Sequence, residues 1–168
     1  MISQSPVRTF FKHIKFTILL CLLLIIYSLK VSSQLIIHPI QDFNFGTVCH
    51  GNAGGTVNIS ITGSRSATGD ILLINTGALS SQAIFEIEAP ASSNISIVNG
   101  PASILIGSNG GFLSFQLGSS DLGTPFKTTA VPSERTRIQI SGTLTVGDVI
   151  ASPPGNYNGT FSITFNQE

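Results

Sequence analysis

The sequence has few charges, no tryptophan and only two cysteines, and these scarcities exclude several classes of protein. Asp, Glu, Lys and Arg make up 10% of the 168 residues, whereas roughly a quarter is usual for a soluble domain. Serine, threonine, asparagine and glycine fill the polar positions instead, and these residues suit strands and turns better than helices. The composition therefore excludes a disordered chain, a collagen, a coiled coil and a scaffold held by several disulfides.

The charges that are present are unevenly distributed along the chain. Four of the eight basic residues lie within the first 30 positions, whereas all eight acidic residues come later. From Gln34 onward, four basic residues against eight acidic ones leave a net charge of −4. A protein that binds nucleic acid through a basic face needs the opposite balance, so nucleic acid is not expected as a partner.

The first 33 residues have the pattern of a secretory signal peptide. Three basic side chains and no acidic one precede an apolar run from Phe16 to Tyr27, and small residues follow. Val31-Ser32-Ser33 suits a cleavage site, so we predict that residues 1–33 are removed and that residues 34–168 form the mature domain. An uncleaved anchor helix is the alternative, but the run is shorter than the roughly 20 apolar residues that span a bilayer. We therefore expect no membrane span after cleavage.

Cysteine and histidine are too scarce in the mature chain for a disulfide framework or a metal centre. Cys49 is its single cysteine, and His38 and His50 are its only histidines. Zinc takes three or four protein ligands, so the neighbouring pair Cys49-His50 is not expected to bind a metal. We predict a buried free thiol for Cys49, with half of an intermolecular disulfide as the alternative.

Alternation of apolar and polar residues dominates the mature chain, and helical periodicity is absent. In the segment 56–62, for example, Val57, Ile59 and Ile61 share one face and only polar groups lie on the other. The expected strands are residues 35–40, 42–45, 56–62, 71–75, 83–88, 94–98, 103–106, 113–117, 135–141, 144–146 and 157–165. Turn residues lie between many of these strands, at 51–55, 69–70, 99–101, 108–111 and 152–155. Residues 118–133 are expected to form a long surface loop or an edge crossing. Short strands with frequent turns predict one antiparallel β-sandwich domain, residues 34–168.

Residues that could carry catalysis or cofactor binding are not found in a recognisable arrangement. The chain has no Gly-x-Ser-x-Gly elbow, no phosphate-binding glycine motif and no His-Glu-x-x-His. Glu86 and Glu88 share one strand face, but two carboxylates on an outward face are usually only solvated. Arg135 and Arg137 form a similar polar face that guards a sheet edge. We therefore expect no enzyme, no catalytic residue, no cofactor and no metal.

Several segments together resemble one family of exported bacterial proteins, the domain of unknown function 4402. The matching segments are residues 42–48, 55–59, 62–69, 142–146 and 155–165. The family is similar in pattern to spore coat protein U and to the pilins that are assembled by the chaperone–usher route. The resemblance implies an immunoglobulin-like, pilin-like β-sandwich in the periplasm or at the cell surface, and it implies no catalytic residues.

The C-terminal segment resembles the assembly strand of such pilins. Their last strand alternates in apolar residues after a glycine that lies fourteenth from the C-terminus, and Gly155 occupies that position here. Gln167 departs from the pattern because pilins have an aromatic residue next to last. The candidate assembly strand consists of Gly155, Tyr157, Phe161, Ile163 and Phe165. The resemblance implies like subunits or a periplasmic chaperone as partners, bound by strand addition.

The segment that precedes the matching region leaves two interpretations open. Residues 34–41 alternate at Leu35 and Ile37, so they form either a short donor strand or the first strand of the domain itself. The C-terminal segment is likewise either an assembly strand or the closing strand of a complete sandwich. An open groove between the first and last strands would indicate an assembly subunit.

We therefore expect a secreted, non-enzymatic structural or adhesive module. The alternative is a module that presents a binding site for glycans or peptides at the cell surface. A pocket with convergent polar groups would indicate this second function.

Overall fold

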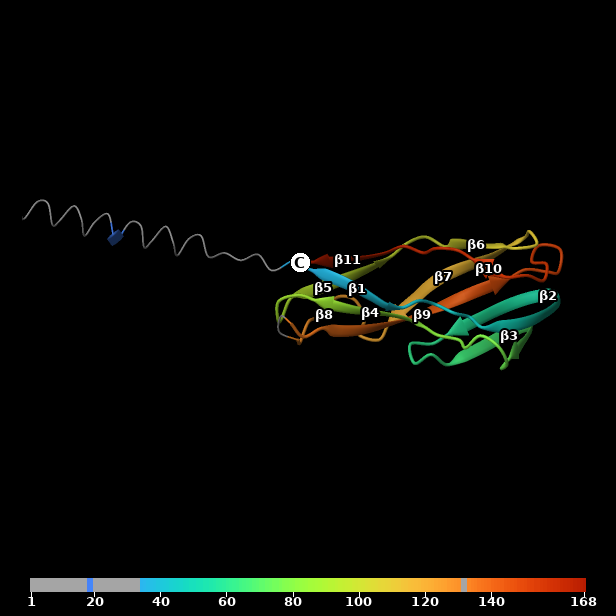
Figure 1. Cartoon of the computed structure of the whole chain (residues 1–168), viewed down its shortest axis with the longest axis horizontal. Coiled ribbons are helices and arrows are strands. Elements are labelled where there is room, and N and C mark those ends of the chain that lie inside the picture. Colours follow the sequence, from blue (N-terminus) through green and yellow to red (C-terminus); the bar gives the residue numbers. More distant parts are fainter. Residues whose placement is uncertain (1–17, 20–33, 131–132) are drawn as a thin grey trace, which may run out of the picture. The chain divides into compact units, whose positions relative to one another are not determined.

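The computed structural model describes residues 18–19, 34–130 and 133–168. The predicted signal peptide thus lies outside the described residues, except for Ile18 and Leu19, which are helical. Within the described ranges, no helix is long and apolar enough to cross a membrane. Residues 34–168 form one compact unit (Figure 1).

This unit is built from strands, as the alternation predicts. The strands are β1 (Ile36–Gln41), β2 (Thr47–Ile59), β3 (Arg65–Ile74), β4 (Ala83–Glu88), β5 (Asn94–Asn99), β6 (Ser103–Gly107), β7 (Phe112–Ser120), β8 (Phe126–Lys127), β9 (Thr136–Val146), β10 (Tyr157–Asn158) and β11 (Ile163–Gln167). All pairs of neighbouring strands are antiparallel. The predicted all-β, antiparallel fold class is confirmed.

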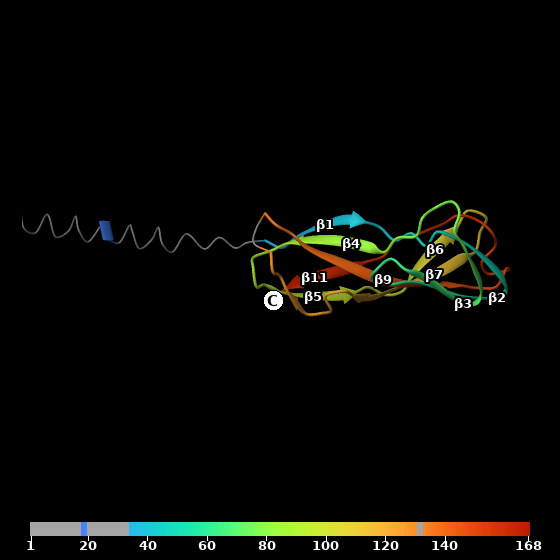
Figure 2. The same ribbon diagram turned by 90° about the horizontal axis from the view of Figure 1, so that it is seen from below.

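The strands form two sheets that pack face to face. The larger sheet has eight strands in the order β1-β4-β9-β7-β6-β10, and β2 joins it by pairing with both β9 and β3. The smaller sheet has the order β11-β5-β8. Figure 2 shows β1 and β4 in one layer, with β5 and β11 in the other. The first and last strands, β1 and β11, are therefore edge strands of opposite layers.

β9 is the central strand of the larger sheet and supplies much of the core. Its inward residues alternate with polar ones, so that Ile138, Ile140, Leu144 and Val146 are all buried. One edge of β9 pairs with β4 over residues 136–140 and with β2 over residues 142–146, and the other edge pairs with β7. β9 therefore runs through the middle of the larger sheet, and its apolar side chains belong to the core cluster.

Four predicted elements differ from the observed ones in where strands begin and end. The candidates 135–141 and 144–146 are one strand, β9, because Gly142 continues the ladder instead of breaking it. The predicted turn at 51–55 lies inside β2, where a register shift between His50 and Gly55 absorbs the extra residues as a bulge. The predicted turn at 69–70 lies inside β3.

Three further predictions differ from the observed strands. The expected strand at 157–165 is two strands, since β10 pairs with β6 of the larger sheet and β11 pairs with β5 of the smaller one. The expected strand at 42–45 makes only an isolated bridge between Asn44 and Ser81. The expected loop at 118–133 contains the end of β7 and the short strand β8.

The position of Ile140 at the centre of β9 gives a first prediction. Ile140→Ala removes three carbon atoms from a site with no solvent exposure, so we expect the free energy of unfolding to fall by about 2–5 kcal/mol. Arg137→Ala, on the outward face of the same strand, should change it by less than about 0.5 kcal/mol. Urea unfolding followed by circular dichroism measures both. Equal effects of the two substitutions would contradict the assignment of β9 as the core strand.

Candidate functional site

A long open groove runs along one side of the sandwich, between chain segments that come from the two ends of the domain. One side is the N-terminal flank, residues 42–50, which leaves β1 and enters β2. The other is the C-terminal flank, residues 152–163, which leads through β10 to β11. The groove consists of two cavities of about 590 and 560 Å³ that share Phe43, Phe45 and Leu105 in their linings.

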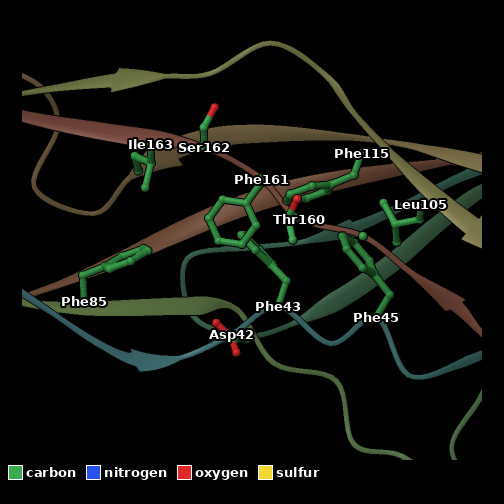
Figure 3. Close-up of a pocket in the computed structure, with 11 residues that line it drawn as sticks. Asp42, Phe43, Phe45, Phe85, Leu105, Phe115, Thr160, Phe161, Ser162 and Ile163 are labelled. Carbon is green, nitrogen blue, oxygen red and sulfur yellow. The ribbon is translucent and has the colours of Figure 1, made fainter.

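The two cavities differ in the chemistry of their walls. The first lies beside Asp42 and is lined by aromatic and aliphatic side chains, of which Figure 3 shows Phe43, Phe45, Phe85 and Phe161 around the opening. The second has an aliphatic floor with amide and hydroxyl groups at its rim. Its floor residues are Leu105, Leu113, Leu144 and Val146, and its polar rim residues include Asn44, Thr47, Asn156 and Asn158.

The C-terminal flank leaves a stretch of backbone without hydrogen-bond partners. Residues 157–158 pair with β6, and residues from Ile163 onward pair with β5. Between them, the backbone groups of Gly159, Thr160 and Phe161 make no hydrogen bond to any described residue. These three residues are wholly or partly exposed, so water can solvate them now and a strand could replace that water.

The N-terminal flank is likewise paired on the side away from the groove only. Asn44 exchanges two hydrogen bonds with Ser81, at 2.9 and 2.7 Å, and residues 47–50 pair with β3. The backbone of Phe43 has no partner among the described residues, and the pairing of β2 with β9 begins only at Gly55. The groove is thus bordered by two antiparallel flanks, each bonded on its outer side.

Within the described ranges, a single hydrogen bond connects the two flanks. The His50 ring donates from Nε2 to the carbonyl oxygen of Ser152, over 2.8 Å, at the end of the groove. Ser152 is itself buried, and its hydroxyl donates to Phe112 and accepts from the backbone N–H of Gly147. This end of the groove is therefore closed and firmly held.

In the middle of the groove, the two flanks are in contact through aromatic rings and not through hydrogen bonds. The ring of Phe43 packs edge-on against Phe161 from the opposite flank, with centroids 5.6 Å apart, and against Phe115 beneath it, at 4.9 Å. Phe45 stacks on Phe43 at 5.9 Å (Figure 3). Gly142 makes room for this cluster, since a Cβ there would lie 2.6 Å from the Phe115 ring and 2.9 Å from the Phe43 ring.

Arg65 fixes the position of the N-terminal flank. Its guanidinium donates to the carbonyl oxygens of Phe45, Thr47 and Ile74 and to the side chain of Asn75. The flank is thereby tied to β3, away from the groove. The alternating pattern does not indicate this role, because Arg65 reads as an ordinary polar residue at a strand start.

The structure places most of the candidate assembly strand along the groove. Gly155 and Tyr157 line the second cavity, whereas Phe161 and Ile163 line the first. Phe165 lies beyond the groove, where its ring packs against Phe85 with centroids 5.5 Å apart. Four of the five residues thus form one wall of a groove, and none of the five lies on a strand that projects from the domain.

The segment that precedes the groove belongs to the domain's own sheet. Residues of β1 pair with β4 from Ile36 to Gln41, and Leu35 and Ile37 pack against the core. Of the two interpretations of residues 34–41, the structure supports the domain's own first strand.

The other candidate residues lie away from the groove or at its end. Cys49 is an exposed free thiol, so the prediction of a buried one is wrong. It lies opposite the exposed Leu72 of β3, on the outward face of β2, whereas the neighbouring Val48 packs against the core. Glu86 and Glu88 face outward and form ion pairs with Arg135 at 3.3 and 3.8 Å. In the part of the chain that the structure describes, no three metal-ligating side chains gather at one place.

Comparisons with known proteins identify the family but supply no characterised relative. A family model described as "Domain of unknown function (DUF4402)" matches residues 35–166. The chain therefore belongs to this family. No curated protein and no solved structure matches it.

Substitution of Arg65 tests whether this side chain ties the N-terminal flank to β3. Arg65→Gln removes a charged donor from three carbonyl oxygens. We therefore expect the free energy of unfolding to fall by about 1–3 kcal/mol. The amides of residues 43–48 should also exchange with solvent faster, because their flank is no longer tied to β3. Arg135→Gln removes exposed ion pairs and should change stability by less than about 1 kcal/mol. Unchanged amide exchange in Arg65→Gln would contradict the assigned role.

Proposed function

We propose that this protein is a secreted, non-enzymatic structural module of the bacterial periplasm or cell surface, which joins an assembly by accepting a β-strand into its groove. The observation that carries this proposal is the pair of flanks with free inner sides on either side of an apolar floor. A strand that enters there finds backbone donors and acceptors on both sides and pockets for every second side chain.

The shape and chemistry of the groove support a strand as its occupant. The N-terminal flank of nine residues extends over about 30 Å if it is fully extended, which is the length of a long strand. Among the lining residues only Asp42, His50 and Tyr157 carry ionisable side chains. The inward residues of an occupant would therefore be apolar and uncharged.

The alternative, a glycan- or peptide-binding module, has one supporting observation. The first cavity has a volume of about 590 Å³, within the range of small-molecule sites, and it is mainly apolar with a few polar groups at its rim. A small ligand would fill this cavity alone and would leave the second cavity and the free backbone unused. For this reason we favour the strand.

Export gives the first test of the proposal. The full chain expressed in a bacterial host should be recovered outside the cytoplasm, and intact-mass measurement should find Gln34 as the first residue. Ser33→Arg places a large charged side chain where cleavage requires a small one, so it should abolish processing at this site. Ser32→Arg lies at the permissive position between the two small residues and should be processed. An unprocessed wild-type protein in the cytoplasm would contradict secretion.

Strand binding is tested with a synthetic peptide of nine residues. Threonine and valine alternate along the peptide, and a lysine stands at each of its ends. A strand that binds only the folded protein stabilises it by about 2.7 kcal/mol at a hundredfold excess over its Kd, and the melting temperature should rise by roughly 5–10 °C. A peptide of the same composition with its valines adjacent should have no effect, because it cannot present alternate side chains to the floor.

A matched pair of variants locates the binding. Leu105→Glu places a carboxylate on the floor shared by both cavities, whereas Ile104→Glu places it on the exposed outer face of the same strand. We expect Leu105→Glu to abolish the shift in melting temperature and Ile104→Glu to retain it. Leu105→Gln replaces the first variant if the glutamate prevents folding. Equal binding by both variants, or no binding of the alternating peptide, would contradict strand addition in the groove.

A further inference from the structure

We propose that the strand accepted by the groove comes from a different protein and not from a second copy of this chain. This inference rests on the proposed function and identifies the kind of partner. The partner supplies an extended, proline-free segment of about nine residues to the groove. This segment has apolar side chains at alternating positions, and none of its inward side chains is charged.

The first argument is the presence of Pro39 in β1. A strand that fills the groove lies between two flanks and forms hydrogen bonds on both edges. Proline has no N–H to donate and is confined to edge strands, strand starts and bulges. β1 tolerates Pro39 because it pairs with β4 alone and shifts register between Pro39 and Gln41. The same segment would be a poor central strand in the groove of another copy.

The second argument is that β1 is already paired and packed in its own domain. Five residues of β1 pair with β4, and Leu35 and Ile37 pack against the core cluster. Removal of β1 would expose this part of the core and a new edge on β4. If β1 of one copy entered the groove of another, the first copy would lose the pairing of β1 with its own β4.

The third argument concerns the C-terminal strand, the other alternating segment near an end of the chain. β11 pairs with β5 over five residues, from Ile163 to Gln167. Phe165 is packed against Phe85 of the opposite sheet. This strand cannot leave without opening the sandwich between its two layers. Both terminal strands of the described domain are thus engaged in its own sheets, whereas the backbone of Gly159, Thr160 and Phe161 along the groove has no partner among the described residues.

The test compares two synthetic peptides that differ at one position. The first has the sequence of residues 34–41, and the second has the same sequence with Pro39→Val. If proline excludes β1 from the groove, the native peptide should leave the melting temperature of the exported protein unchanged. The Pro39→Val peptide should raise it, as should the peptide of alternating threonine and valine.

A locked variant tests the second argument with the whole protein. His38 and Glu86 are directly opposite each other on β1 and β4, at a spacing that suits a disulfide. His38→Cys with Glu86→Cys, in a Cys49→Ser background, fixes β1 in its own sheet. The Kd of the threonine–valine peptide should agree within about twofold between the oxidised and reduced forms, because β1 stays in its own sheet in both. Light scattering should find a monomer in both.

The outcomes separate the two proposals. If the native peptide binds as tightly as the Pro39→Val peptide, or if the reduced protein forms oligomers that the oxidised one does not, a second copy supplies the strand. The present inference is then wrong, but strand addition stands. If none of the three peptides binds and the protein remains monomeric, strand addition itself is wrong, and this inference fails with it.

Discussion

The pairing of β9 on both of its edges is the constraint from which the rest of the structure follows. β4 occupies one part of an edge of β9 and β2 occupies the next part. β2 meets β9 only from Gly55 onward, so the first residues of β2 have a partner on the β3 side alone. The groove is the space that remains beside these residues. The groove therefore exists because β4 and β2 pair with successive parts of the same edge of β9.

Much of the fold could be predicted from the sequence because alternation is a local signal. Side chains in strands have a period of two, so the inward residues of β4, β7 and β9 could be identified without knowledge of their partners. The division of residues 157–165 could not, because Tyr157, Phe161, Ile163 and Phe165 keep the same alternation in both sheets. Which sheet a strand joins depends on long-range register, and no short segment encodes it.

The groove could be predicted only in part, for a related reason. The sequence placed the residues of its C-terminal wall, from Gly155 to Ile163, on one alternating segment. It did not indicate that the opposite wall would be held away by Arg65, because that role depends on carbonyl groups about 20 residues earlier in the chain. Unpaired backbone edges leave no trace in side-chain pattern, since every residue type has the same main-chain groups. The exposure of Cys49 could not be predicted either, because the residues around it do not indicate which face of this part of β2 meets the core.

The two ends of the groove together act as stops that set a length. At one end, His50 reaches across to Ser152. At the other, Phe85 and Phe165 close the space between the layers. The strand that we propose as the occupant would therefore enter from the side into a space of limited length. A strand of matching length would have one favoured alignment there, so the proposed assembly would fix the orientation of its parts as well as join them.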